Sequence, residues 1–167
     1  MKRIGLISDT HSHLEESVFA HFAECDEIWH AGDIGTLALA DRLAAFKPFR
    51  AVYGNIDGGD IRREYPLDLH FKCEEVKVWL THIGGYPGRY SKRIKDQLKE
   101  VNPDLFICGH SHILKVMPDP KYQLLHINPG AAGVHGFHQV KTLIRFTIDG
   151  TEIKDLQVIE MGRRGAI

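Results

Sequence analysis

Cysteine is scarce in this chain, and its few cysteines show no pairing pattern. The 167 residues contain three, Cys25, Cys73 and Cys108, which lie far apart and form no Cys-x-x-Cys motif. This scattered, odd-numbered set argues against a disulfide framework and against a cysteine zinc knuckle. We therefore expect buried thiols in a reducing compartment.

Long apolar runs and an excess of charge are missing too. The N-terminal run after Lys2-Arg3 is broken by Ser8-Asp9, which makes it too short for a signal peptide. No other stretch approaches membrane-spanning length, so we expect a cytoplasmic protein without a membrane partner. The formal net charge is only −1, and nothing favours specific nucleic-acid binding. Function must therefore come from specific sites.

No repeat, low-complexity tract or long linker divides the chain. Its length fits a single domain spanning residues 1–167. Hydrophobic residues at 43% and charged residues at 26% are ordinary for a globular protein. Histidine is in excess, with 11 residues, and several of them stand where apolar runs end.

Apolar periodicity predicts alternating strands and helices in the first half and more strand in the second. The expected strands of the first half are 2–8, 27–31 and 49–53, and its helices are 13–24 and 36–46. The second half should hold strands at 67–72, 76–80, 105–108, 114–117 and 124–127, with a helix at 90–101. A hairpin at 142–159 should turn at Asp149-Gly150, before a loose end at 162–165. Two packed sheets with helices outside fit this pattern, and so does one large mixed sheet.

Five predicted strands end in residues that can bind a metal ion. These are Asp9 and His11 after the first strand, then Asp33, Asn55 and His82 after later strands, and His110 and His112 in a Gly-His-x-His motif. The carboxyl ends of parallel strands share one edge of a sheet, where ligands bind. We therefore expect these side chains to converge.

The set suits two divalent ions. One can take Asp9, His11 and a later histidine, and the other can take Asn55, His82 and another histidine. Asp33 could bridge them, because a carboxylate has two oxygens and can hold metals roughly 3.5–4 Å apart. With a hydroxide between the ions, about one net positive charge remains, which favours a phosphate oxyanion. No serine or cysteine nucleophile is required.

Together the five motifs resemble the motif set of the calcineurin-like metallophosphoesterases. The short length and Asn128-Pro-Gly130 are similar to the small bacterial and archaeal phosphodiesterase branch of that family. The resemblance spans residues 4 to about 148 and implies a four-layer α/β/β/α sandwich of two mixed sheets flanked by helices. It also implies two metal ions, with Mn²⁺ the first choice and Ni²⁺, Zn²⁺ or Fe²⁺ the others. By motif, the first metal takes Asp9, His11, Asp33 and His112, and the second takes Asp33, Asn55, His82 and His110.

Asp33 and Asn55 are the expected catalytic residues of the metal centre. Many family members have a histidine directly after this asparagine, but the chain has Ile56, so leaving-group protonation needs another residue. His13 is the nearest candidate, although it could equally be a solvent-facing residue at a helix start. Asn55 and Arg89 are the expected substrate contacts.

The remaining candidates have a structural alternative. Four arginines, Arg62, Arg63, Arg89 and Arg93, could form a phosphate-binding rim or a solvated face. His135 and His138 could border the site or simply occupy a glycine-rich loop. We expect structural roles for the other histidines in strands and helices, His21, His30, His70 and His126.

The predicted function is metal-dependent hydrolysis of a small phosphoester, and diesters are favoured by the resemblance. One alternative is a phosphomonoesterase or nucleotide phosphatase using the same site. Another is a non-catalytic protein-binding scaffold like the retromer subunit of related fold, although all seven ligand positions hold competent residues. A homo-oligomer is possible.

Overall fold

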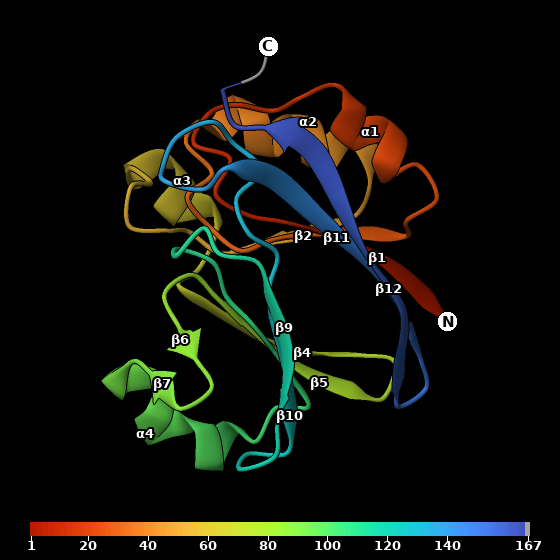
Figure 1. The fold of residues 1–167 in the computed structure, drawn as a ribbon, viewed down its shortest axis with the longest axis vertical. Coiled ribbons are helices and arrows are strands. Elements are labelled where there is room, and N and C mark those ends of the chain that lie inside the picture. Colours follow the sequence, from red (N-terminus) through yellow and green to blue (C-terminus); the bar gives the residue numbers. More distant parts are fainter. Residues whose placement is uncertain (166–167) are drawn as a thin grey trace.

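Two five-stranded sheets pack against each other in the computed structural model, which describes residues 1–165 (Figure 1). The strands are β1 (Lys2–Ile7), β2 (Glu27–His30), β3 (Phe49–Ala51), β4 (Asp68–Cys73), β5 (Val76–Thr81), β6 (Gly85–Tyr86), β7 (Arg89–Tyr90), β8 (Leu105–Ile107), β9 (Lys115–Asp119), β10 (Leu124–Asn128), β11 (Val140–Asp149) and β12 (Glu152–Arg163). The helices are α1 (Ser17–His21), α2 (Leu37–Phe46), α3 (Gly59–Glu64) and α4 (Lys92–Val101).

Both sheets are mixed. The first has the order β12-β11-β1-β2-β3, in which β1, β2 and β3 are parallel. The second has the order β4-β5-β8-β10-β9, in which β5, β8 and β10 are parallel. The sequence left open two sheets or one, and residues 1–165 form two large sheets, with β6 and β7 paired separately as a two-stranded sheet. The carboxyl ends of two sets of parallel strands can therefore meet at one site.

The two sheets and the helices outside them form four layers, and an apolar cluster lies between each pair of neighbouring layers. Side chains such as Leu6 and Trp29 from the first sheet and Leu80 and Ile107 from the second fill the space between the sheets. A second cluster packs α1, α2 and α3 on the outer face of the first sheet, and a third packs α4 on the outer face of the second (Figure 1). The predicted α/β/β/α sandwich is confirmed.

The first helix is much shorter than its periodicity predicts. Leu14, Val18 and Phe22 do share one buried face, as expected for a helix over 13–24. However, only Ser17–His21 is helical, because the chain leaves β1 through a turn in which the His13 N–H donates to the Thr10 carbonyl. The prediction of helix is therefore wrong for residues 13–16 and also for 22–24, which form a turn.

Three other local predictions need correction. The helix predicted from residue 90 begins at Lys92, because Gly85–Tyr86 and Arg89–Tyr90 form an unpredicted hairpin before it. The strand predicted at 114–117 runs instead from Lys115 to Asp119, and Pro118 is tolerated inside it because β9 is an edge strand. The presumed loose end at 162–165 begins within β12, which continues to Arg163.

The absences noted in the sequence have structural counterparts. All three cysteines are buried free thiols. Among residues 1–165, no helix has both the length and the apolar character needed to cross a bilayer.

Two histidines are fully buried, as their positions in predicted strands suggested. His30 lies in β2, where its Nδ1 accepts from the Gly32 N–H and its Nε2 contacts the Thr10 hydroxyl at 3.0 Å. His126 lies in β10, packed near the rings of Tyr90 and Phe106. Burial lowers the pKa of each histidine to about 4, so both are neutral in the native protein.

This burial predicts a loss of stability in mild acid. Because the native pKa values lie below the ordinary 6.5, the unfolded chain binds more protons between pH 6.5 and 4, and stability falls there as pH falls. Each histidine contributes a loss of roughly 3 kcal/mol over the full window. Urea unfolding of metal-free protein should show this slope, and His126→Gln should reduce it by about 1.4 kcal/mol per pH unit. The exposed His70 supplies the control His70→Gln, and an unchanged slope in His126→Gln would contradict the assignment.

Candidate metal centre

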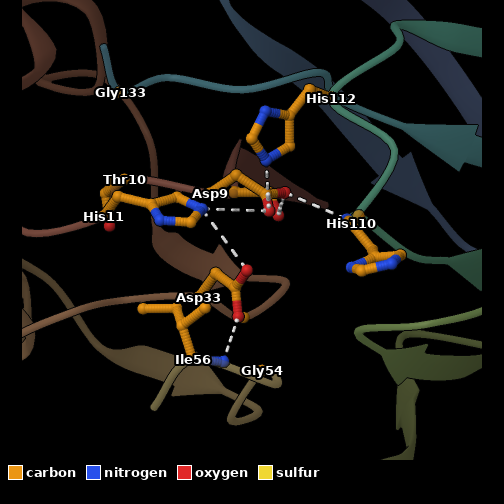
Figure 2. Close-up of polar contacts among 12 residues, drawn as sticks. Asp9, Thr10, His11, Asp33, Gly54, Ile56, His110, His112 and Gly133 are labelled. Carbon is orange, nitrogen blue, oxygen red and sulfur yellow. Dashed lines mark hydrogen bonds and ion pairs between the residues drawn. The ribbon is translucent and has the colours of Figure 1, made fainter. Parts of the chain in front are cut away.

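The seven predicted ligands come together where strands of both sheets end. Asp9 and His11 follow β1, Asp33 follows β2, Asn55 follows β3, His82 follows β5, and His110 and His112 follow β8. Six of them form two groups with ligand atoms in mutual reach, Asp9, His11 and His112 in one and Asp33, His82 and His110 in the other. The convergence expected from parallel strand ends is therefore present (Figure 2).

The first group surrounds the buried carboxylate of Asp9. Its Oδ2 accepts from the Ser8 hydroxyl at 2.6 Å and from the His110 N–H at 3.1 Å, which fixes the carboxylate plane. Its Oδ1 lies 3.1 Å from His112 Nε2 and 3.9 Å from His11 Nε2 (Figure 2). One oxygen is thus held by the protein while the other faces three imidazoles, because His82 Nε2 also lies 3.8 Å from Oδ1.

The second group is arranged around Asn55. Its Oδ1 lies 3.1 Å from His82 Nε2 and 3.0 Å from His110 Nδ1. The other ring nitrogen of His82, Nδ1, lies 2.7 Å from the Ala31 carbonyl oxygen, to which it donates. This bond places the free lone pair of His82 on Nε2, the nitrogen that faces the other ligands.

Asp33 lies between the two groups. Its Oδ1 accepts the Ile56 N–H at 3.1 Å. Its Oδ2 is 3.3 Å from His11 Nε2 and 3.2 Å from His82 Nε2, so it faces a histidine of each group. Figure 2 shows Asp33 pointing toward His11 on one side and held by the Ile56 amide on the other.

The donor set fits divalent metal ions. Among residues 1–165, the buried atoms Asp9 Oδ1 and His11 Nε2 have no hydrogen-bond partner. Unpaired buried polar atoms are costly, and a cation bound by both would remove that cost. Carboxylate, amide and imidazole ligands without a thiolate are compatible with manganese, iron, nickel and zinc.

The electrostatics of the ligands point the same way. Burial alone favours the neutral carboxyl of Asp33, but the nearby imidazoles of His11 and His82 hold its pKa below the ordinary value. The same balance, with His11 and His112 as partners, lowers the pKa of Asp9. In turn Asp33 and Asp9 raise the pKa of His11 to about 9. The site therefore keeps two ionised carboxylates and attracts positive charge.

Left-handed backbone is concentrated at the ligands. Asp9, His11, Asp33, His110 and His112 all have positive φ, between 45° and 71°. Such conformations cost free energy for residues other than glycine and persist where the surrounding structure enforces them. Here the loops enforce each other, because the N–H groups of Asp9 and His11 donate to the carbonyls of Gly32 and Asp33.

Two buried residues that were not predicted as site residues hold the ligand loops in place. The Asp57 carboxylate accepts the N–H groups of Ile34, Gly35 and Gly54, and so joins the Asp33 loop to the Asn55 loop. The Asn128 side chain donates to the Gly109 carbonyl and the Ser111 hydroxyl, beside His110 and His112. The available signals were a carboxylate two residues after Asn55 and an asparagine before Pro-Gly.

The loop of residues 133–138 borders the site. The His135 ring lies 4.8 Å from the His11 ring, and the His138 ring lies 5.1 Å from the His112 ring. The sequence favoured a loop role without such contacts, but both histidines pack against ligands. Gly136 lies between them, with its backbone directly against the His112 ring.

Two predicted site residues are placed away from the ligand groups. His13 is 41% exposed, and its Nε2 lies 3.8 Å from Glu15, which is itself bonded to the buried Lys141. Arg89 is exposed on β7 in the short hairpin before α4. None of the contacts found among residues 1–165 joins either side chain to a ligand, and their roles stay predictions. A cavity of about 420 Å³ beside Asn55 and His82 is lined by Arg62 and Arg93 instead.

Comparison with known proteins agrees with this geometry. The family model described as the calcineurin-like phosphoesterase superfamily domain matches residues 1–151. A probable metallophosphoesterase of Methanothermobacter thermautotrophicus is 30% identical over 166 residues. The match covers 95% of this chain and 92% of that protein.

Solved structures are similar in fold. A structure described as a novel archaeal phosphodiesterase has a TM-score of 0.74 at 23% identity, covering 94% of this chain and 99% of its own. Vps29 of Chaetomium thermophilum has a TM-score of 0.76 at 12% identity, covering 96% and 97%. At these identities the likeness establishes the shared fold alone.

Proposed function

Because the chain belongs to the calcineurin-like phosphoesterase superfamily, we propose that it hydrolyses phosphoric esters, preferably diesters, with two divalent metal ions. Asp9, His11, Asp33 and His112 would hold one ion, and Asp33, Asn55, His82 and His110 the other. Bound ions supply an activated water and neutralise charge on the phosphate oxygens.

The position of Asp33 carries the two-ion proposal. Its Oδ2 is nearly equidistant from His11 and His82, at 3.3 and 3.2 Å, and these histidines belong to different ligand groups. A carboxylate that bridges two ions takes this placement, and Asp33 is nearer to both histidines than Asp9, whose Oδ1 is 3.9 Å from His11 and 3.8 Å from His82. Asp9 and Asp33 are the only acidic members of the set, so the neutral imidazoles and the Asn55 amide leave surplus positive charge for an anionic ester.

The exposed His13 is the proposed proton donor to the leaving group. Its ring is 41% exposed and lies in the turn that follows Asp9 and His11. Ile56 cannot fill this role, since its side chain is aliphatic. A donor outside the set of predicted ligands suits esters whose leaving groups need little protonation.

A comparison of two esters with one leaving group tests the proposal. Protein loaded separately with Mn²⁺, Ni²⁺ or Zn²⁺ is assayed on bis(4-nitrophenyl) phosphate and on 4-nitrophenyl phosphate, with bound metal measured in parallel. We expect two ions per chain, the highest rate with Mn²⁺, and a kcat/KM at least tenfold higher for the diester. A higher kcat/KM for the monoester would favour the phosphomonoesterase. No hydrolysis of either ester at full loading would contradict the enzyme and favour the protein-binding scaffold.

A further inference from the structure

Exposed aliphatic side chains gather beside the metal centre. Asn55, His82 and His112 are each followed directly by an isoleucine. These isoleucines, Ile56, Ile83 and Ile113, are 47%, 42% and 59% exposed. Large apolar side chains that stay exposed in one place commonly mark a binding surface.

One part of this surface is hollowed. The cavity beside the second ligand group has a volume of about 420 Å³, within the range of about 300–1,000 Å³ that small-molecule sites occupy. Asn55 and His82 line the cavity on the side of the predicted ligands, and Leu67, Ile83 and Tyr53 contribute apolar surface. A group attached to a phosphate at the ligands could therefore extend into the cavity without leaving the site.

The positive charges at this cavity are already engaged. Arg93 bonds to the Asp68 carboxylate at 2.7 Å and to the Thr81 hydroxyl at 3.0 Å. Arg62 donates to the Asp57 carbonyl at 2.7 Å, and its guanidinium lies 4.6 Å from the centre of the Tyr53 ring. A second anionic group on the substrate would have to compete with the Asp68 carboxylate for Arg93, whereas an uncharged group would leave that ion pair intact.

We propose that this cavity binds an uncharged, mainly apolar ester substituent, so that the substrates are phosphoesters with alkyl or aryl groups rather than with a further anionic group. The inference rests on the proposed function, because the phosphate is placed at the metal ligands. Burying one methylene is worth about 0.8 kcal/mol, or about fourfold in affinity. The walls of the cavity are partly exposed, so five methylenes should give at least about tenfold.

Binding of three monoalkyl phosphates tests the proposal directly. Methyl, hexyl and 5-carboxypentyl phosphate carry one substituent each, and the last two differ mainly by a terminal carboxylate. Calorimetry on the metal-loaded protein should show hexyl phosphate binding at least tenfold more tightly than methyl phosphate. The carboxypentyl compound should lose most of that advantage. Equal affinity for all three, or tighter binding of the carboxylate, would overturn the proposal.

Serine variants locate the binding. Leu67→Ser and Ile83→Ser should each reduce the ratio of hexyl to methyl affinity by about threefold or more. Val158→Ser is the matched control, because Val158 on β12 is also 42% exposed but lies outside the cavity. The ratio compares two ligands of the same metal centre, so a general loss of metal cancels. A ratio unchanged in both cavity variants would overturn the assignment of this cavity.

The experiments distinguish a failure of the cavity inference from a failure of the proposed function. If bis(4-nitrophenyl) phosphate is hydrolysed but the alkyl chain adds no affinity, the cavity inference is wrong and the phosphoesterase stands. If no ester is hydrolysed and methyl phosphate does not bind, the proposed function is wrong and the cavity inference falls with it.

Discussion

Replacement of Asp33 by asparagine is expected to reduce bound metal from two ions per chain to at most one and to lower kcat/KM for a diester by about 10³-fold. Asparagine keeps the shape of the side chain but has only one oxygen. That oxygen can accept the Ile56 N–H, as Oδ1 does now at 3.1 Å. The amide NH₂ then faces His11 and His82, where it offers no lone pair to a cation. Metal analysis at saturation and steady-state kinetics measure the two effects.

Asp60→Asn is the matched control for this change. Asp60 is exposed at the start of α3, where its carboxylate accepts the Ile61 N–H, so the same loss of charge occurs outside the ligand set. Its metal content and kcat/KM should stay within about threefold of the original protein. Two ions and near-normal activity in Asp33→Asn would contradict the bridging role.

The convergence of the predicted ligands could be expected from the sequence because each is the first or second residue able to bind metal after a strand. Strand ends are fixed by the hydrogen bonds of the sheet, so residues such as Asp9 and His82 have little freedom in where they lie. The alternation of strands and helices then brings the strand ends to one edge. The order of the two sheets was not readable, since sequence periodicity reports burial and does not report which strands pair.

The residues that hold the ligand loops in place, Asp57 and Asn128, could not be predicted in the same way. Asp57 and Asn128 act by accepting from or donating to backbone groups of other loops, and such contacts leave no periodic signal. The turn before α1 shows a related limit. Leu14, Val18 and Phe22 are buried at helical spacing, but burial at that spacing does not require every intervening residue to be helical.

Surface residues were the hardest to place. Arg62, Arg89 and Arg93 all lie in polar segments of the sequence. The sequence therefore could not decide which of them lies at a cavity. The unpredicted hairpin of β6 and β7 carries Arg89, whereas the start of α4 carries Arg93 to the cavity wall. Loop and hairpin geometry thus decides which arginine lines the cavity, while strand ends decide where the predicted metal ligands lie.

Gly54→Ala is expected to damage the metal centre without removing a ligand. A Cβ at Gly54 would lie 2.1 Å from Asp33 Oδ1 and 2.3 Å from the Asp33 backbone nitrogen. The close neighbour is partly backbone, so Asp33 must shift and loses its bond from the Ile56 N–H. We expect kcat/KM to fall by about 10²-fold, since misplacement of a catalytic group by about 1 Å has that cost. Overpacking should also lower the free energy of unfolding by about 1–3 kcal/mol.

Gly58→Ala separates this contact from a general effect of alanine in the loop. At Gly58 the nearest atom to an added Cβ is Asp60 Oδ1 at 3.6 Å, and the backbone has φ −85°. This variant should keep its metal content and activity within about threefold, measured beside Gly54→Ala. If both variants keep near-normal metal content and kcat/KM, Asp33 tolerates the displacement and the prediction is wrong. A loss confined to Gly54→Ala would instead explain the glycine before Asn55 as the space that the Asp33 carboxylate requires.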